Sequence, residues 1–341
     1  MTVFPKVALV ILNWNGKKYL QKFIPSIVSS SYPNLEIIVG DNASNDESLS
    51  YLEDNFPAIR VIQNDKNYGF AEGYNRILAQ VEADYFVLLN SDVEVESHWI
   101  EPVIELMQSD EKIAAAQPKL LNYANKHLFE YAGAAGGLID IFGYPFCRGR
   151  IFDAIEADTG QYDTVAEIFW ASGAAFFIKK KYWDEAGGFD PHFFAHMEEI
   201  DLCWRLKNKG YKIMYCPDST VYHVGGGTLH AEHPYKTYLN FRNNLKMLQK
   251  NLPVGQSILI ISIRFWLDLI SLIKYLVEGR FKNAMAISKA HRHFLRDIIR
   301  SKNKIQKDTS KFNSVGVLNY SIALKHFILK HFYKKDSKAN R

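Results

Sequence analysis

Residues 1–90 alternate between short apolar runs and helical patterns, and this alternation most constrains the fold. The apolar runs cover residues 6–12, 35–40, 59–64 and 84–90. Helices are predicted over residues 17–30, 44–55 and 71–81. The second helix opens with Ser44 three residues before Glu47, which predicts a capping box. Strands that alternate with helices at this pitch form βαβ units, so we expect an α/β fold with a mostly parallel sheet.

The segments that follow the predicted strands are the first places to search for a site, because ligands of such sheets bind beyond the carboxyl ends of the strands. These segments are NWNG (13–16), DNASNDES (41–48), NDKNYGFAEGYN (64–75) and NSD (90–92). None of them contains the G-x-G-x-x-G of dinucleotide-binding folds or the G-x-x-x-x-G-K-[ST] of a P-loop. The sequence therefore disfavours both of those nucleotide-binding modes.

The triplet Asn90-Ser91-Asp92 ends the fourth apolar run and has two interpretations. Asn, Ser and Asp all favour turns, so the triplet is consistent with a strand followed by a turn. Alternatively, Asp92 is a metal ligand at the mouth of the sheet, because carboxylate oxygens are preferred by hard divalent cations. The triplet alone leaves both open.

The pattern is less regular after residue 112. Residues 114–121 are consistent with a strand, and residues 122–165, rich in Gly, Tyr and Asp, read as irregular or hairpin structure. Further predicted elements are a strand over 168–180, a helix over 198–211 that ends at Gly210, and a strand, turn and short strand within 212–227. Three cysteines lie far apart without metal-ligand spacing, which indicates a reduced, intracellular protein with no disulfide framework.

Charge is distributed unevenly along the chain. Residues 1–241 hold 20 Lys and Arg against 32 Asp and Glu, whereas residues 242–341 hold 21 against 5. Residues 257–277 are very apolar but contain Arg264, Asp268 and Lys274, which favours an amphipathic helix in a membrane interface or against a partner over a spanning helix. Residues 281–304 repeat this pattern with more basic residues. We expect the tail to meet an anionic membrane surface rather than nucleic acid; the alternative is a helical cap with a solvated basic face.

Seven motifs occur in an order that resembles the family 2 glycosyltransferases, and within them the rhamnosyltransferase-like branch. They are VILNWNG, DNASNDES, NYGFAEGYN, LLNSD, WASGAAFFIKK, GGFDPHFFAHMEEIDLCWRL and VYHVGGGT. The resemblance covers about residues 5–245. It implies a GT-A fold, a nucleotide-sugar donor, a divalent cation and inversion at the sugar carbon. We accordingly predict a catalytic domain over 1–245 and a helical, basic, membrane-associating region over 246–341.

The resemblance also implies roles for residues in these motifs. Asp92 takes the place of the last carboxylate of the family's D-x-D motif and is the expected ligand of Mg²⁺ or Mn²⁺, together with His223, beside Gly225–Gly227. Asn90 stands where the first Asp is usual and has the ribose as an alternative partner. Asp41 is expected to accept a hydrogen bond from the pyrimidine N–H. The full expected nucleotide-sugar set is Asn13, Asn15, Asp41, Asn42, Gly69, Asn75, Asn90, Ser91, Asp92, Trp170, Gly173 and Arg242.

The stretch MEEIDLCWRL carries the expected catalytic acids. An inverting transfer needs a base that takes the proton of the acceptor hydroxyl, and a carboxylate is suitable. The family's base position, usually Asp, maps to Glu199. Glu198, Asp201 and Arg205 share one helix face, and Asp201 and Arg205 have the i,i+4 spacing of an ion pair. The competing interpretation is that the acids only complement the dipole at a helix N-terminus.

The function expected from these features is transfer of a sugar, with rhamnose as the leading candidate, from a dTDP- or UDP-sugar. The acceptor is expected to be a saccharide or lipid-linked saccharide of a bacterial cell-surface polysaccharide, and the site of action the cytoplasmic face of the cell membrane. A sugar nucleotidyltransferase is a poorer match, because NWNGKK is not a Gly-rich phosphate loop. A non-catalytic scaffold that uses the basic tail gives no role to Asp92 or Glu199.

Overall fold

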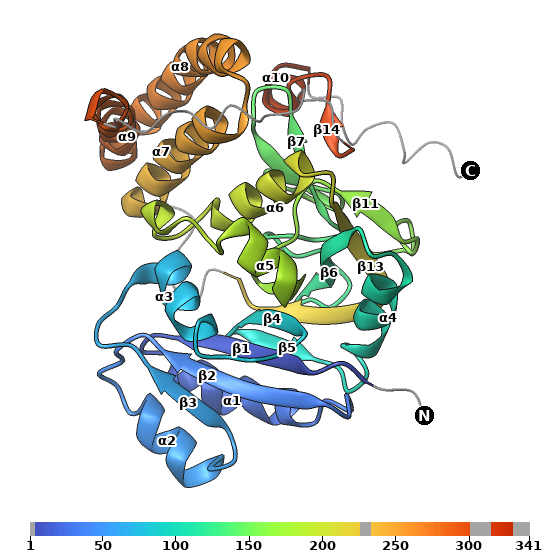
Figure 1. The fold of residues 1–341 in the computed structure, drawn as a ribbon. Coiled ribbons are helices and arrows are strands. Elements are labelled where there is room, and N and C mark those ends of the chain that lie inside the picture. The colour runs from blue at the N-terminus through green and yellow to red at the C-terminus, as the bar shows by residue number, and fades with distance from the viewer. Residues whose placement is uncertain (1–3, 226–232, 301–314, 330–341) are drawn as a thin grey trace. The chain divides into compact units, whose positions relative to one another are not determined.

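A computed structural model of the chain describes residues 4–225, 233–300 and 315–329. The chain divides into two compact units (Figure 1). The first comprises Met1–Leu138, Phe146–Phe194 and Glu198–Gly225, and the second comprises Ile139–Pro145, Ala195–Met197 and Gly226–Arg341. The predicted domain boundary at residue 245 falls inside a helix of the second unit.

A mixed sheet forms the centre of the first unit, with the order β11-β13-β6-β12-β4-β1-β2-β3 and β5 paired to β13 among the described residues. The strands are β1 (Val7–Asn13), β2 (Leu35–Asp41), β3 (Arg60–Gln63), β4 (Tyr85–Asn90), β5 (Val93–Val95), β6 (Ile113–Asn122), β11 (Ala166–Ile168), β12 (Ala175–Lys179) and β13 (Lys212–His223). Strands β3, β2, β1 and β4 are parallel, as predicted from the alternation. Strand β12 runs antiparallel to its neighbours β4 and β6.

Helices cover both faces of the parallel strands (Figure 1). They are α1 (Lys17–Val28), α2 (Ser48–Asn55), α3 (Gly69–Leu78), α4 (Glu101–Ser109), α5 (Lys180–Ala186) and α6 (Glu198–Asn208), with the short 3-10 helix η1 (Pro191–Phe193). Leu9 of β1 belongs to a buried cluster with Leu20 of α1. On the opposite face, Gly40 of β2 lies directly under Ile77 of α3, where a methyl group would meet that side chain. Burial on both faces explains why the central strands β1 and β4 are apolar along almost their whole length.

Three local predictions were wrong. The second helix begins at Ser48, and Asp46 rather than Ser44 accepts its first hydrogen bonds, from the backbone N–H (3.1 Å) and hydroxyl (2.5 Å) of Ser48. The run 168–180 is not one strand, because Trp170 pairs with Gly137 between β11 and β12. The expected turn within 212–227 is a register shift inside the single strand β13, between Cys216 and Thr220.

The second unit is mainly helical in the part that the structure describes. It contains α7 (Pro234–Asn251), α8 (Val254–Val277), α9 (Phe281–Arg300), α10 (Ile322–Leu329) and β14 (Val317–Leu318). Strand β14 pairs in parallel with Ile139 and Asp140 of β7 (Gly137–Asp140). The irregular stretch predicted over 122–165 contains β7 and three short strands, β8 (Pro145–Cys147), β9 (Arg150–Ile151) and β10 (Ala154–Ile155). Among the described helices, α8 alone has the length and apolar composition to cross a membrane.

Candidate active site

The carboxyl ends of β1, β2 and β4 meet at one edge of the sheet. Asn13 is in register with Asp41, and Leu12 is in register with Asn90. Buried Asp41 accepts hydrogen bonds from Ser44, through the backbone N–H (2.9 Å) and the hydroxyl (2.6 Å), and from Asn13 Nδ2 (3.1 Å). Asn13 Oδ1 is a buried acceptor without a hydrogen-bond partner among the described residues. A ligand that donates hydrogen bonds would satisfy it.

Asn42 organises the loop that follows β3. Its Nδ2 donates to Asn67 Oδ1 (3.0 Å) and to the Gly69 carbonyl (2.9 Å), and its Oδ1 accepts from Asn64 Nδ2 and the Tyr68 N–H (3.1 Å each). Gly69 has a φ of 77°, and a Cβ there would lie 2.5 Å from the Phe194 ring. Both residues therefore shape the loop, rather than offering side-chain groups to a ligand.

Asn75 and Asn15 also have protein partners. The Asn75 amide donates to the Phe189 carbonyl (2.8 Å) and accepts from the Phe189 N–H (3.0 Å), so it fastens α3 to the segment before η1. Exposed Asn15 accepts a hydrogen bond from the Asn45 N–H (2.8 Å) and lines a surface hollow of about 570 Å³ with Lys17 and Glu47. Asn15 is thus open to solvent on one side, whereas both polar atoms of the Asn75 amide are bonded to the Phe189 backbone.

Asp92, His223 and Glu130 form a buried row at the ends of β4 and β13. His223 Nε2 lies 3.1 Å from Asp92 Oδ1, and His223 Nδ1 lies 3.2 Å from Glu130 Oε1. All three side chains are at most 9% exposed. Asn90 Nδ2 lies 3.5 Å from the same Nε2, and the Asp92 carbonyl accepts from the Val224 N–H (3.0 Å). The NSD triplet does end β4 in a turn, as one interpretation predicted, and Asp92 in addition contacts His223.

The charge of this row depends on His223. Burial lowers the pKa of His223, but the carboxylates of Glu130 and Asp92 outweigh burial and raise the pKa to about 10. Without a cation, the imidazole is therefore protonated and lies between two carboxylates, with a hydrogen bond to Asp92 and an ion pair with Glu130 that lacks hydrogen-bond geometry at Nδ1. One imidazolium and two carboxylates leave this buried row with a net charge of −1, which favours a cation there.

Two of these atoms have the spacing of ligands to a hard divalent cation, and no group of three or more His, Cys, Asp or Glu side chains that could hold a metal ion occurs among the described residues. Adjacent ligands of an octahedral ion with bonds of about 2.1 Å lie about 3 Å apart, which matches the separation of Asp92 Oδ1 and His223 Nε2. Glu130 stands at the other ring nitrogen, where the carboxylate that orients a metal-binding histidine is usually found. Of the predicted glycine run 225–227, Gly225 lies within the described residues, and residues 226 and 227 lie outside them. A Cβ at Gly225 would lie 2.8 Å from Glu130 Oε1.

Glu130 was missed by the sequence analysis. It lies in the irregular stretch between β6 and β7, where neither periodicity nor a family motif marks it. Only the tertiary contact with His223, 93 positions away along the chain, reveals its place. Even a correct prediction that Glu130 is buried would not have distinguished it from acids with a purely structural role.

The predicted catalytic acids lie at the N-terminus of α6. Glu198 is 4% exposed, and its Oε2 has no hydrogen-bond partner among the described residues. Burial, and then the neighbouring Glu199, raise the pKa of Glu198 well above its usual range. Glu199 is half-buried, and its Cγ lies 4.0 Å from where a Cβ at Gly173 would be. Ala174, next to Gly173, accepts a hydrogen bond from the Asn90 N–H (3.0 Å), so this acid pair lies near the end of β4.

Asp201 has a different environment from the two glutamates. It is fully buried and accepts from Arg205 Nε (2.8 Å), which confirms the predicted ion pair. Arg205 also donates to the carbonyls of Ala186 (2.5 Å) and Gly188 (2.7 Å) at the end of α5. Asp201 thus acts through Arg205 to hold the chain that leads into the acid cluster.

Two remaining predicted residues are engaged elsewhere. Trp170 is 6% exposed, donates from Nε1 to the Leu138 carbonyl (2.9 Å) and packs on Gly137, so it belongs to the interior. Arg242 lies on α7 in the second unit, where it donates to Asn243 Oδ1 and lies over the Tyr238 ring.

Comparison with known sequences finds glycosyltransferases, in agreement with the resemblance noted from the motifs. The family model described as Glycosyl transferase family 2 matches residues 8–162. The N-acetylglucosaminyl-diphospho-decaprenol L-rhamnosyltransferase of Mycobacterium tuberculosis is 21% identical over 231 residues, which cover 63% of this chain and 75% of the relative. The rhamnosyltransferase WbbL of Escherichia coli K12 is 24% identical over 249 residues, which cover 70% of this chain and 90% of the relative.

Comparison with solved structures shows the fold. The mannosyltransferase PcManGT from Pyrobaculum calidifontis, solved with GDP-Man and Mn²⁺, has a TM-score of 0.53 and 13% identity, over 89% of this chain and 77% of that chain. GalNAc-T7, solved with UDP, GalNAc and Mn²⁺, also has a TM-score of 0.53, with 18% identity over 64% of this chain. This chain spans only 43% of the GalNAc-T7 chain.

Proposed function

The chain carries a family 2 glycosyltransferase domain, and we propose that it transfers a sugar, with inversion, from a dTDP- or UDP-sugar to a saccharide or lipid-linked saccharide. The observation that carries this proposal is the buried row of Glu130, His223 and Asp92 at the ends of β4 and β13. Similarity to two rhamnosyltransferases makes rhamnose the first sugar to test and a bacterial cell-surface polysaccharide the expected product.

The proposed cation site consists of Asp92 and His223, with Glu130 behind the histidine. A bound Mg²⁺ or Mn²⁺ would stabilise the negative charge that develops on the departing nucleoside diphosphate. His223 would bind the cation through Nε2 as a neutral imidazole with its proton on Nδ1, and Glu130, 3.2 Å from Nδ1, would orient the ring. Two structural neighbours solved with Mn²⁺ support a divalent cation without deciding between the metals.

Glu199 is the proposed base. Glu199 is half-buried beside Gly173, whereas Glu198 is buried, and burial raises its pKa well above the usual range, which favours its protonated form. A base must be ionised to accept the proton of the acceptor hydroxyl, so the less buried acid suits this role. The hydroxyl oxygen then bonds to the sugar carbon as the bond to the diphosphate breaks. Asp201 and Arg205 position the segment that leads to these acids.

The pyrimidine is proposed to bind beside Asp41 and Asn13, where Asn13 Oδ1 is the buried acceptor that still needs a donor. The acceptor substrate is proposed to come from the cytoplasmic face of the cell membrane, where the basic region 246–341 would hold the enzyme on anionic lipid. That charge pattern, not a structural contact, supports this location.

The test is release of nucleoside diphosphate from dTDP-rhamnose, UDP-glucose and UDP-N-acetylglucosamine, with a polyprenyl-diphosphate-linked N-acetylglucosamine as acceptor. We expect one donor to be consumed in an acceptor-dependent reaction that EDTA stops and Mn²⁺ or Mg²⁺ restores. Glu199→Gln should reduce the rate by about 10²–10⁴-fold, the usual share of general base catalysis. A rate that neither EDTA nor Glu199→Gln changes would overturn the proposed mechanism.

A further inference from the structure

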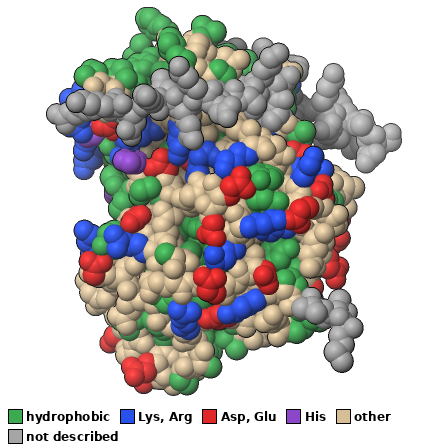
Figure 2. Space-filling model, viewed as in Figure 1, with side chains coloured by type: hydrophobic (Ala, Val, Ile, Leu, Met, Phe, Trp, Pro, Cys, Tyr) green, Lys and Arg blue, Asp and Glu red, His purple; other side chains and the backbone are tan. Residues whose placement is uncertain are grey.

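Helix α8 has its polar residues inside and its apolar residues outside. The outward face of α8, defined by Leu259, Trp266, Ile270, Ile273 and Val277, is between 50% and 83% exposed at each residue. These positions recur every three, four or seven residues, so they form one stripe about 27 Å long at 1.5 Å per residue. Figure 2 shows hydrophobic side chains gathered at the top of the view, where Figure 1 places α8.

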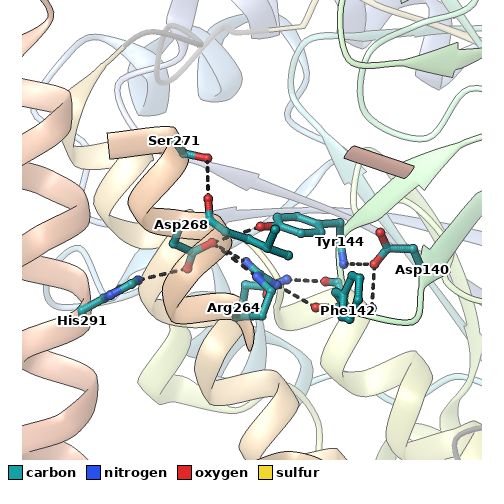
Figure 3. Close-up of polar contacts among 10 residues, drawn as sticks. Asp140, Phe142, Tyr144, Arg264, Asp268, Ser271 and His291 are labelled. Atoms are coloured by element: carbon teal, nitrogen blue, oxygen red, sulfur yellow. Dashed lines mark hydrogen bonds and ion pairs between the residues drawn. The ribbon is translucent and has the colours of Figure 1, made fainter. Parts of the chain in front are cut away.

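The inward face of α8 is charged and fully paired (Figure 3). Arg264 is 2% exposed and Asp268 is 0% exposed, and the two form an ion pair with a separation of 3.3 Å. Asp268 also accepts from the Tyr144 hydroxyl (3.1 Å) and lies 3.0 Å from His291 Nε2. Arg264 also donates to the Phe142 carbonyl (2.9 Å) and to Asn244 Oδ1.

This polarity is the reverse of a helix in a water-soluble protein, where the apolar stripe faces the core. Contiguous apolar surface of this extent is rarely left in water, so it marks a surface that meets something apolar. Every charge of the inward face is already neutralised within the second unit, so only the outward face is left to make a new contact. The outward face contains no charged residue at its five positions.

We propose that the outward face of α8 inserts into the interface of an anionic lipid bilayer, with the helix axis parallel to the membrane plane. A spanning orientation is disfavoured because Arg264 and Asp268 lie at the middle of Val254–Val277 and would be placed at the bilayer midplane. An in-plane helix buries its apolar side in the acyl boundary and keeps the ion pair within the protein.

The charge of the region favours lipid over a second copy of the chain as the partner of the outward face of α8. Helix α9 packs beside α8, with the Phe265 and His291 rings 4.4 Å apart. The exposed side of α9 mixes apolar residues with four exposed cations, Lys282, Lys289, Arg292 and Arg296. Residues 242–341 carry a net charge of +16, which attracts an anionic surface and opposes pairing of two identical basic regions.

The inference deepens the membrane placement in the proposed function, on which it rests, by naming the surface that enters the lipid. The experiment is flotation of the full chain with vesicles of phosphatidylcholine and phosphatidylglycerol. The test variant is Ile270→Glu/Ile273→Glu, and the matched control is Val28→Glu, at a valine on α1 that is 46% exposed. Titration of soluble nucleotide with each variant measures the donor site separately. A failure of membrane binding can therefore be distinguished from a failure of nucleotide binding.

We expect the double variant to bind vesicles at least about tenfold more weakly than wild type, since two carboxylates replace two side chains that would leave water. Val28→Glu should bind as wild type does. Fluorophores attached at Leu259→Cys and Ile270→Cys, both on the outward face, should report the same shallow depth from lipid-borne quenchers. Vesicle binding unchanged in the double variant, a deep probe at residue 270, or a wild-type dimer that the double variant dissociates would each overturn the proposal.

Discussion

At the scale of single residues, Glu130 decides whether the row at the ends of β4 and β13 is a cation site or only a buried ion network. Its carboxylate is 3.2 Å from His223 Nδ1, and it reaches His223 from a different loop than Asp92 does. If the row is a cation site, Glu130 orients the His223 ring. If the row is only an ion network, Glu130 contributes only its charge. The two roles predict different consequences of a neutral substitution.

Glu130→Gln should weaken Mn²⁺ binding by about 10–100-fold, the usual effect of losing a carboxylate that orients a ligating histidine. The measurement is a competition of Mn²⁺ with a chromophoric chelator, with Glu94→Gln as the control, because Glu94 is a partly exposed acid paired with Lys126. Equal Mn²⁺ affinity in both variants would mean that Glu130 does not support a cation site.

Glu198 gives a prediction for the pH dependence of stability. Its folded-state pKa is raised above the unfolded value of 4.5, so the folded chain binds more protons than the unfolded chain between those two values. The free energy of unfolding contributed by this group therefore falls as the pH rises through that window. Glu198→Gln removes the group, so the variant should gain stability over wild type between pH 4.5 and pH 7.5.

Urea unfolding of both proteins at the two pH values measures this difference. A stability gap that is the same at the two values would show that Glu198 ionises as readily when folded as when unfolded. The comparison is internal to each protein, so a uniform loss from the amide substitution does not affect it.

At the scale of elements, Asn75 illustrates a residue that a family motif marks but that the structure uses to join two segments. Asn75→Ala should lower the free energy of unfolding by about 1–3 kcal/mol, because the N–H and carbonyl of Phe189 lose their partner. Asn55→Ala, at the exposed end of α2, should change it by less than about 0.5 kcal/mol. Chemical unfolding distinguishes the two, and equal small effects would contradict the assigned role of Asn75.

The elements also show what the sequence could predict. The first four strands and three helices follow from periodicity, because their apolar residues are buried between layers. One error arose from a local competitor, because Asp46 and not Ser44 accepts the hydrogen bonds of Ser48 at the start of α2. Another arose from a tertiary partner, because Trp170 pairs with Gly137 and interrupts a β-rich run. Register alone brings Asn13, Asp41 and Asn90 together, which explains why the post-strand segments located one edge of the site.

The site itself was only partly predictable. Asp92 and His223 were expected as a pair, and the structure places them 3.1 Å apart. Glu130 could not be predicted, because its neighbour His223 lies 93 positions further along the chain. Conversely, Asn42 and Trp170 were expected to face the nucleotide sugar, but their polar groups are engaged by the protein. A motif shows which residues are shared, and only packing separates those that bind from those that support.

At the scale of the whole molecule, the uneven charge of the chain predicts how it partitions between anionic surfaces. Binding to anionic vesicles should weaken as salt increases, because exposed cations of the basic region are screened. A fraction of the protein should remain bound to vesicles at high salt, because the outward face of α8 makes apolar contacts with lipid. Duplex DNA offers no such apolar contacts. Excess duplex DNA should therefore fail to displace the chain from vesicles in a flotation assay. Complete displacement would indicate a purely electrostatic, polymer-binding tail.

The central claim is that a divalent cation and a pyrimidine nucleotide bind together at the edge formed by β1, β2 and β4. Calorimetric titration of dTDP and UDP, with and without Mn²⁺, tests it most directly, with wild type compared to Asp92→Ala. Glu94→Ala, an acid on β5 that contacts neither His223 nor Asp92 among the described contacts, is the control. We expect nucleotide binding to require Mn²⁺, to survive in Glu94→Ala and to be lost in Asp92→Ala. Binding that is indifferent to both Mn²⁺ and Asp92, or no nucleotide binding under any condition, would contradict it.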